Sequence, residues 1–505
     1  NRDYTWGILL AQAAEALQLG PWPGGVRYDI PVEEVGAHEL SNMENVRIGT
    51  GGQAESRKGT LSYKSAAAIA ATPTLTMAAE YDVDATTTQV VIVAGAVIYY
   101  YNSGWTDITG TVTATAGDDN TWEWINANGT LVATNGVDTN AFKYTGTGNA
   151  SDLDDDARFT KGKHIEWFDN RAWIGNVNGA TNQVWYSDTA DIETWGDTSF
   201  FNFDGIVQGL RAAQNYISVH TTTGIYVLRP TGNASLPYSS QKLTSEAGLD
   251  GRSIVAIPGD KQYMVRRDGI YSWWGNAELT KVSDQLDGGY WPNLNKARLH
   301  KSHATYYPQE NEIWFFLPHG AAQTNMNHVM VFNILSETWY GPYKGWERNC
   351  STLIDDVVHA GDFGGFLWDH DEGDDDNGTA IAATFQTGAP AAIAPDVRTR
   401  FLNARHYYDA KGSYTIEISQ QSADLVGTSA NLPLKGTGFT LDEDLLDNGI
   451  TLSEIRQESA GTKLSGYAPQ CSLQYTMNAA DQSFIIRKAI LRHRPVGRFN
   501  KPNPV

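Results

Sequence analysis

The stretch Val91-Ile92-Val93-Ala94-Gly95-Ala96-Val97-Ile98-Tyr99-Tyr100-Tyr101 shows the unit from which much of this chain is built. A run of apolar residues leads into a glycine turn, and a second, aromatic-rich run follows it. β-Branched and aromatic residues on both sides of a turn favour two antiparallel strands over a helix. The pattern returns along the chain, and its first runs begin near Val91, Leu131, Ala172, Ile217, Tyr263, Ile313 and Val357.

The spacing of these runs predicts the architecture. The steps between them are 40, 41, 45, 46, 50 and 44 residues. Repeats of this length, made of short strands, are typical of β-propeller blades, which stack because one four-stranded blade cannot bury both of its faces alone. We therefore predict an all-β chain with a β-propeller of about seven blades over residues 60–378. An array of evenly spaced hairpins in an ordinary β-sandwich is the alternative.

The flanking segments predict two further parts. Residues 4–20 carry an apolar stripe that ends at Gly20-Pro21, so we expect a short N-terminal helix, followed by an extended arm to residue 59. Alternation of apolar and polar residues returns after residue 378 and predicts a C-terminal antiparallel β-sandwich over residues 379–505. Its last stretch, Arg487–Lys501, holds six Lys or Arg and no acid, and is either an exposed tail or a docking segment for a neighbouring subunit.

Composition bounds the class of protein. At 505 residues, with 49 Gly and 16 Trp, the chain has the size of two or three folded, loop-rich domains. The formal net charge of −21 argues against a phosphate-binding surface over most of the molecule. The sequence has no apolar stretch long enough to span a bilayer and no evident signal peptide, so we expect synthesis in the cytoplasm.

An acidic loop is the first candidate site. Asp369, Asp371, Asp374 and Asp376 stand near alternate positions, as oxygen ligands of calcium often do. Gly373 stands where a ligand belongs, however, and no closing Glu follows. A solvated turn between domains accounts for the same residues, so we assign no metal ligand.

Catalytic motifs are not evident. Propeller glycosidases need paired carboxylates, and no spacing marks a pair among the many acids of this chain. The sequence has no HExxH, GxSxG or phosphate-binding loop. Cys350 and Cys471 match no metal or redox spacing and are expected to be buried thiols, with one long-range disulfide left open. We predict no catalytic, cofactor-binding or metal-binding residues and no enzyme. The acids considered were Glu123, Asp169, Asp204, Asp268 and Glu312.

One ordered set of elements resembles a known family. Asn45-Val46-Arg47-Ile48, followed by Gly51-Gly52 and Glu55-Ser56-Arg57-Lys58-Gly59, resembles the opening of β-propeller tail proteins of short-tailed bacteriophages. The later order of elements over roughly residues 22–495 is similar to the family called tail stabilisation, hub or nozzle proteins. These later elements include Val184-Trp185-Tyr186-Ser187-Asp188, Gly224-Ile225-Tyr226-Val227-Leu228, Asn311-Glu312-Ile313-Trp314-Phe315 and Thr338-Trp339-Tyr340.

The resemblance implies a virion structural protein without catalytic residues or cofactors. It implies a ring, most often sixfold, beneath the portal and adaptor, that lines or closes the channel through which DNA leaves. The expected partners are further copies of the chain, the adaptor and portal, and tail fibre or spike proteins, with genomic DNA passing transiently. The expected location is the virion tail, after synthesis in the host cytoplasm. The alternatives are a propeller that binds or hydrolyses host surface polysaccharide, and a secreted or cell-surface propeller that binds a protein.

Overall fold

The computed structural model describes residues 14–153, 158–246, 248, 251–395, 397–409, 414–422, 425–434 and 457–498. Within these ranges the ordered elements are strands and five single-turn 3₁₀ helices, so the all-β prediction is confirmed. None of the described helices is long and apolar enough to cross a membrane. The short helices are η1 (Tyr63–Ser65), η2 (Gly251–Ser253), η3 (Asp284–Leu286), η4 (Trp291–Asn293) and η5 (Leu299–Lys301).

The chain divides into two compact units. The first, here called the ring unit, comprises Gly59–Glu337 and Lys344–Gly373. The second, here called the sandwich unit, comprises the residues up to Lys58, Thr338–Tyr343 and the residues from Asp374 onward. The chain therefore passes between the units at residues 58/59, 337/338, 343/344 and 373/374, whereas the sequence predicted boundaries at residues 59/60 and 378/379.

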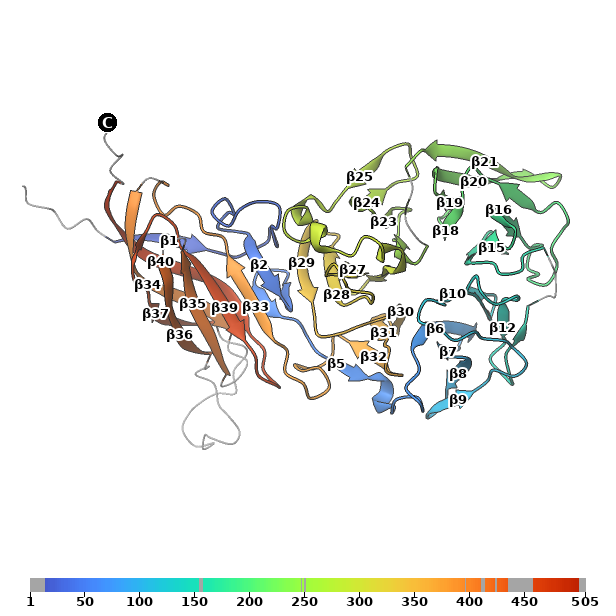
Figure 1. Ribbon diagram of the computed structural model, residues 1–505, viewed down its shortest axis with the longest axis horizontal. Coiled ribbons are helices and arrows are strands. Elements are labelled where there is room, and N and C mark those ends of the chain that lie inside the picture. Colours follow the sequence, from blue (N-terminus) through green and yellow to red (C-terminus); the bar gives the residue numbers. More distant parts are fainter. Residues whose placement is uncertain are drawn as a thin grey trace, which may run out of the picture. The chain divides into compact units, whose positions relative to one another are not determined.

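Seven antiparallel sheets of four strands follow one another along the chain (Figure 1). In order, the sheets are β6 (Leu75–Asp84), β7 (Thr87–Ala94), β8 (Val97–Tyr101), β9 (Trp105–Asp107); β10 (Glu123–Ala127), β11 (Thr130–Thr134), β12 (Phe142–Tyr144), β13 (Ser151–Asp152); β14 (His164–Phe168), β15 (Arg171–Val177), β16 (Ala180–Tyr186), β17 (Phe200–Asn202); β18 (Val207–Ala212), β19 (Ile217–Thr221), β20 (Gly224–Asn233), β21 (Leu236–Thr244); β22 (Ile254–Ala256), β23 (Gln262–Arg266), β24 (Gly269–Trp273), β25 (Leu279–Lys281); β26 (His303–Tyr307), β27 (Glu312–Leu317), β28 (His328–Asn333), β29 (Thr338–Tyr343); and β30 (Cys350–Ile354), β31 (Val357–Gly361), β32 (Leu367–His370), β5 (Thr60–Ser62).

The first strands of these sheets contact one another in cyclic order. β6 contacts β10, and the series runs on through β14, β18, β22 and β26 to β30, which contacts β6 again. Apolar side chains fill the closing gap, where Leu75 and Ile92 of the first sheet pack with Ile354 and Leu367 of the last. A closed ring of four-stranded antiparallel sheets is the arrangement of a β-propeller.

The predicted repeat corresponds to one strand of each sheet. Every apolar run named above falls in a second strand: β7, β11, β15, β19, β23, β27 or β31. The last sheet is completed by β5 from the start of the ring unit, with Thr60 opposite His370 and Ser62 opposite Trp368. The two ends of the repeat array are thus joined by backbone pairing.

Two antiparallel sheets form the sandwich unit. The larger has the strand order β3 (Val46–Ile48), β4 (Ala54–Ser56), β40 (Ile485–Arg498), β34 (Val397–Asp409), β37 (Gln457–Lys463), with β1 (Glu15–Leu19) also on β40 and β38 (Tyr467–Ala468) also on β34. The smaller has the order β2 (Leu40–Glu44), β33 (Ala383–Thr387), β39 (Ser472–Met477), β35 (Tyr414–Ser422), β36 (Leu425–Leu434). Their facing sides meet where Nδ1 of His406 lies 2.8 Å from the Tyr475 hydroxyl and the Phe385 ring packs near Phe484.

The predicted N-terminal helix is wrong where the structure describes it. Glu15–Leu19 is strand β1, and it pairs with β40 from Glu15 opposite His493 to Leu19 opposite Ala489. Pairing with a distant strand has overridden a helical pattern that is only a weak local preference. The rest of that prediction, residues 4–13, lies outside the described residues. The predicted separate arm also differs from the structure, because β1 to β4 belong to the same sheets as the C-terminal strands.

Candidate functional site

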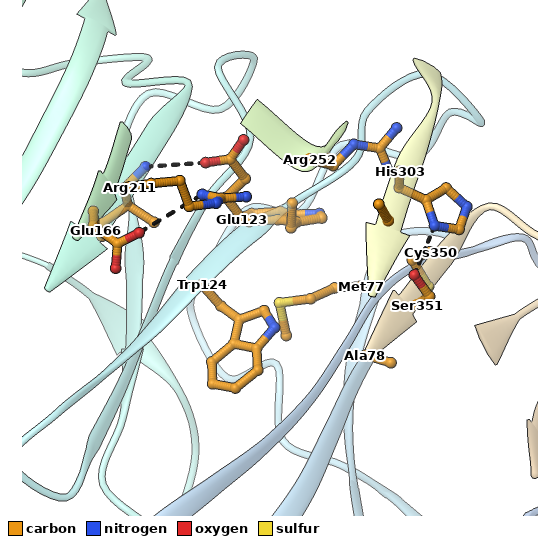
Figure 2. Close-up of a pocket in the computed structure, with 13 residues that line it drawn as sticks. Met77, Ala78, Glu123, Trp124, Glu166, Arg211, Arg252, His303, Cys350 and Ser351 are labelled. Atoms are coloured by element: carbon orange, nitrogen blue, oxygen red, sulfur yellow. Dashed lines mark hydrogen bonds and ion pairs between the residues drawn. The ribbon is translucent and has the colours of Figure 1, made fainter. Parts of the chain in front are cut away.

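A cavity of about 230 Å³ lies at the centre of the ring unit. Its lining comes from the first strand of each sheet or from the turn just before it, which is the geometry of a propeller axis (Figure 2). The contributions are Met77 from β6, Glu123 from β10, Glu166 from β14, Arg211 from β18, Arg252 from η2, His303 from β26 and Ser351 from β30.

Glu123 is held in place by the neighbouring strand. Its Oε1 lies 2.9 Å from Nδ1 of the fully buried His164, and its Oε2 accepts a 3.4 Å hydrogen bond from the Ile165 amide. Gly251 allows this packing, because a Cβ at that position would lie 2.5 Å from Oε1 of Glu123. Both partners belong to the next sheet, which therefore orients the carboxylate.

Glu166 and Arg211 form the second polar pair. Nη1 of Arg211 lies 3.7 Å from Oε2 of Glu166, whose Oε1 accepts a 3.0 Å hydrogen bond from the Trp167 amide. Burial raises the pKa of the Glu166 carboxyl, and Arg211 offsets part of that rise. Arg211 is itself held by backbone carbonyls, since it donates to those of Leu210, Gly251 and Ile254.

A hydroxyl–imidazole pair lies on the opposite wall. Nδ1 of His303 lies 2.7 Å from Oγ of Ser351, and its Nε2 faces the Arg348 carbonyl at 3.4 Å. Oγ of Ser351 also accepts a 2.6 Å hydrogen bond from Thr305. Burial, and then the charge of Arg252, lower the pKa of His303 well below its ordinary value, so the imidazole is a weak base. The imidazole and the two hydroxyls thus form one hydrogen-bonded group on this wall.

The cavity is small for a ligand site. Its volume of about 230 Å³ is below the roughly 300–1,000 Å³ of ordinary ligand pockets. Its two arginines are committed to backbone carbonyls, because Arg252 donates to those of Asn349 and Lys301. The polar groups therefore neutralise and fix one another, and the remaining space fits water or a small polar molecule.

The other acids considered from the sequence act as hydrogen-bond acceptors away from the cavity. Asp169, Asp204 and Asp268 lie in turns and accept from the hydroxyls of Tyr238, Tyr226 and Tyr271, respectively. Glu312 is buried on β27 and accepts from the Trp314 indole at 2.9 Å. Of the five, the structure brings only Glu123 to the axial cavity.

The acidic loop is divided between the two units. Asp369 pairs with His359 and Asp371 accepts from the Tyr307 hydroxyl, all within the ring unit. Asp376 belongs to the sandwich unit. Among the described residues there is no group of three or more His, Cys, Asp or Glu that could hold a metal ion.

Both cysteines are free, buried thiols, as the sequence indicated. Cys350 lines the axial cavity and Cys471 lies in the sandwich unit. Burial raises the pKa of each thiol to about 12, so neither is a thiolate nucleophile at neutral pH.

Sequence reasoning missed Glu166 and Arg211, although the repeat contains a signal for them. Glu166 and Arg211 are 45 residues apart, which is the step from Ala172 to Ile217. Glu123 and His164 are likewise 41 residues apart, the step from Leu131 to Ala172. Polar side chains that can pair and stand one repeat length apart therefore predict contacts between neighbouring first strands.

The fold and the cavity define a propeller-type protein whose axis is filled by paired polar side chains. Searches against protein-family models and against curated proteins gave no match. Solved structures similar to the chain include BamB from Moraxella catarrhalis, with 10% identity over 62% of this chain and 97% of that one, at a TM-score of 0.39. Virginiamycin B lyase from Staphylococcus aureus has 11% sequence identity over 61% of this chain and 97% of its own, with a TM-score of 0.41. PorZ is a surface component of the type-IX secretion system of Porphyromonas gingivalis. It has 12% sequence identity over 66% of this chain and 43% of its own, with a TM-score of 0.39. These scores are too low to establish a shared fold, so the architecture rests on the sheets and their cyclic contacts.

Proposed function

We propose that the chain is a structural component of a short-tailed phage tail, a nozzle or hub subunit that forms a ring below the portal and adaptor. In this proposal each of the seven four-stranded sheets is one blade of a seven-bladed propeller. Copies of the chain stand side by side around the DNA exit channel in the virion, and fibre or spike proteins attach to the ring.

The observation that carries the proposal is the environment of the segment at residues 45–59, which resembles the opening of that family. Arg57 is almost fully buried and donates to Asn45 at 2.9 Å and to both carboxylate oxygens of Asp376, at 2.9 and 2.6 Å. Asn45 donates in turn to the Ala382 carbonyl at 2.8 Å. Asn45 and Arg57 precede the first crossing between the units, and Asp376 follows the last one. These residues thus form a buried hydrogen-bonded network next to the points where the chain enters and leaves the ring unit.

The axial cavity also bears on the proposal. A space of about 230 Å³ cannot admit a nucleic acid strand, so DNA would have to pass through a channel formed by several copies. The ring unit has 36 Asp or Glu and 19 Lys or Arg, a net charge of −17. An acidic channel wall would repel the DNA backbone and limit adhesion during ejection.

Immunogold electron microscopy of phage particles with antibody against this chain tests the proposal. Label at the tail, just below the capsid or at its tip, is the expected result. Absence of label from intact particles, with the chain in the soluble fraction, would refute the nozzle assignment.

A propeller that binds or hydrolyses host polysaccharide is the second candidate. It is favoured by two acids in one cavity, Glu123 and Glu166, of which Glu166 has the raised pKa of a general acid. Screening host polysaccharide for released reducing sugar, with wild type and Glu166→Gln side by side, separates the candidates. Turnover that the substitution abolishes would establish the enzyme; a structural subunit gives none in either sample.

A further inference from the structure

One face of the larger sheet in the sandwich unit is lined with cations. Arg398, Arg400 and Arg405 of β34 are exposed on it, and a register shift between Phe401 and Asn403 keeps them on one side despite their odd spacing. The neighbouring strands add exposed or half-buried cations in register. We call the seven residues the basic face: Arg398, Arg400, Arg405, Lys463, Lys488, Arg492 and Arg494.

Within the described residues, no carboxylate forms an ion pair with a cation of the basic face. Asp409 is the only described carboxylate that pairs with a cation of β40, and its partner, Arg487, lies outside the basic face. Arg400 lies directly opposite Arg494 in the ladder. Like charges directly opposite each other destabilise a sheet, so this arrangement costs folding free energy unless an anionic partner covers it.

The basic face also has the shape and the side chains of a contact surface. A shallow groove of about 440 Å³ runs over it between Arg405, Lys463 and Arg492. Tyr467 lies beneath the guanidinium groups of Arg398 and Arg400, which hold the tyrosine ring against the charged surface. Arginine and tyrosine are both enriched in protein–protein interfaces.

The charges of the two units are unequal. The ring unit carries −17, whereas the rest of the chain, with 22 Asp or Glu and 18 Lys or Arg, carries −4. Every copy of the protein therefore carries a strongly acidic unit whose charge is opposite to that of the basic face. A nucleic acid is the less favourable occupant, because the net charge of −21 repels a phosphate backbone at long range.

We propose that the basic face docks on the acidic ring unit of a second copy of the chain. The inference rests on the proposed ring and names the surface through which its subunits join. The contact is electrostatic, so salt weakens it: the screening length falls from about 10 Å at 0.1 M to about 3 Å at 1 M.

Sedimentation velocity of the full chain across a salt series tests the contact. The variant Arg400→Ser/Arg405→Ser/Arg492→Ser/Arg494→Ser is compared with a control that loses four cations of the ring unit, Lys161→Ser/Arg229→Ser/Lys242→Ser/Lys261→Ser. We expect wild type and control to associate at low salt, and the basic-face variant to associate on the order of tenfold more weakly or not at all. A variant with Lys at the same four basic-face positions keeps the charge and should associate like wild type, which separates loss of charge from loss of fold.

The inference is overturned if the basic-face variant associates like wild type, or if wild type stays monomeric throughout the salt series. Duplex DNA, followed by fluorescence anisotropy, is the competing ligand: binding lost in the basic-face variant, without any change in self-association, would assign the face to nucleic acid instead. Immunogold labelling of the tail is a separate readout. If tails are labelled and the basic-face variant still self-associates, the proposed ring stands, but its subunits join through another surface.

Discussion

At the scale of single residues, Arg57 is a buried cation whose loss should destabilise the sandwich unit. Its guanidinium is almost fully buried and binds Asp376, which is also largely buried, through two hydrogen bonds. Removing one partner of a buried ion pair leaves an uncompensated charge. We expect Arg57→Ala to lower the free energy of unfolding of the sandwich unit by about 3 kcal/mol, measured by urea titration.

A second ion pair in the same unit provides the control. Arg27 pairs with Asp29 and Glu39, but about a quarter of each side chain is exposed. Ion pairs accessible to water contribute about 0.2–1 kcal/mol, so Arg27→Ala should change little. If both variants lose the same free energy of unfolding, the buried ion pair of Arg57 stabilises the sandwich unit no more than the exposed pairs of Arg27 do.

The two cysteines give a prediction about reactivity. Because both thiols are buried and their pKa is raised to about 12, a thiol-specific reagent should label neither in the native protein and both after denaturation. Ser240→Cys, at an exposed position of β21, is the positive control. Rapid native labelling of Cys350 would mean that the axial cavity opens.

From the sequence, Glu123 was considered as a candidate site residue, whereas Glu166 and Arg211 of the same axial cavity were not. Glu123 was among several equivalent acids because nothing local distinguishes a carboxylate on a first strand from one in a turn. Glu166 becomes a partner of Arg211 only when two strands 45 residues apart are placed side by side. The repeat length supplies that placement, so the missing step was to compare charges across repeats.

At the scale of elements, the closing seam of the ring is the point most sensitive to added volume. Gly361 of β31 faces the first sheet, and a Cβ there would lie 2.5 Å from Cβ of Leu75 and 2.8 Å from Sγ of Cys350. Cβ of Leu75 is fixed to its backbone and cannot move without displacing β6, and overpacking typically costs about 1–3 kcal/mol. We expect Gly361→Ala to lower the melting temperature of the ring unit, measured by calorimetry.

Gly364, in the turn that follows β31, is the matched position. A Cβ there meets only Asp362, at 3.5 Å, which is ordinary contact. Gly364→Ala adds the same methyl group without the clash and should leave the melting temperature nearly unchanged. If Gly361→Ala proves equally mild, the seam between the first and last sheets is looser than the packing indicates.

The elements also show where sequence patterns succeed and fail. The second strands were located because each is a buried apolar run followed by a turn, which is a local signal. β1 was read as part of a helix because the alanines and leucines of residues 9–17 favour helix locally. The strand that pairs with it, β40, lies more than 450 residues away. Long-range pairing of this kind leaves no mark on a short stretch of sequence.

At the scale of the whole molecule, buried histidines should make both units sensitive to mild acid. Burial lowers the pKa of His220 and His406 to about 4 and that of His328 to about 3. The same side chains titrate near 6.5 when unfolded. Below pH 6.5 the unfolded chain therefore binds more protons, and the free energy of unfolding falls by about 2 kcal/mol per histidine at pH 5. Stability should be fully present above pH 7, as urea titrations at pH 5, 6 and 7 would show.

His406 allows this pH dependence to be assigned to one residue. It lies between the two sheets of the sandwich unit, with Nδ1 2.8 Å from the Tyr475 hydroxyl and Nε2 2.8 Å from Oγ1 of Thr462. Glutamine offers a donor and an acceptor at this position but does not titrate. We expect His406→Gln to lose stability at pH 7 yet to remove about one proton from the pH dependence of the sandwich transition between pH 7 and 5. Exposed His300→Gln is the control and should leave both quantities unchanged. An undiminished slope in His406→Gln would show that another group takes up the proton, and the acid sensitivity of the sandwich unit would then have to come from its carboxylates.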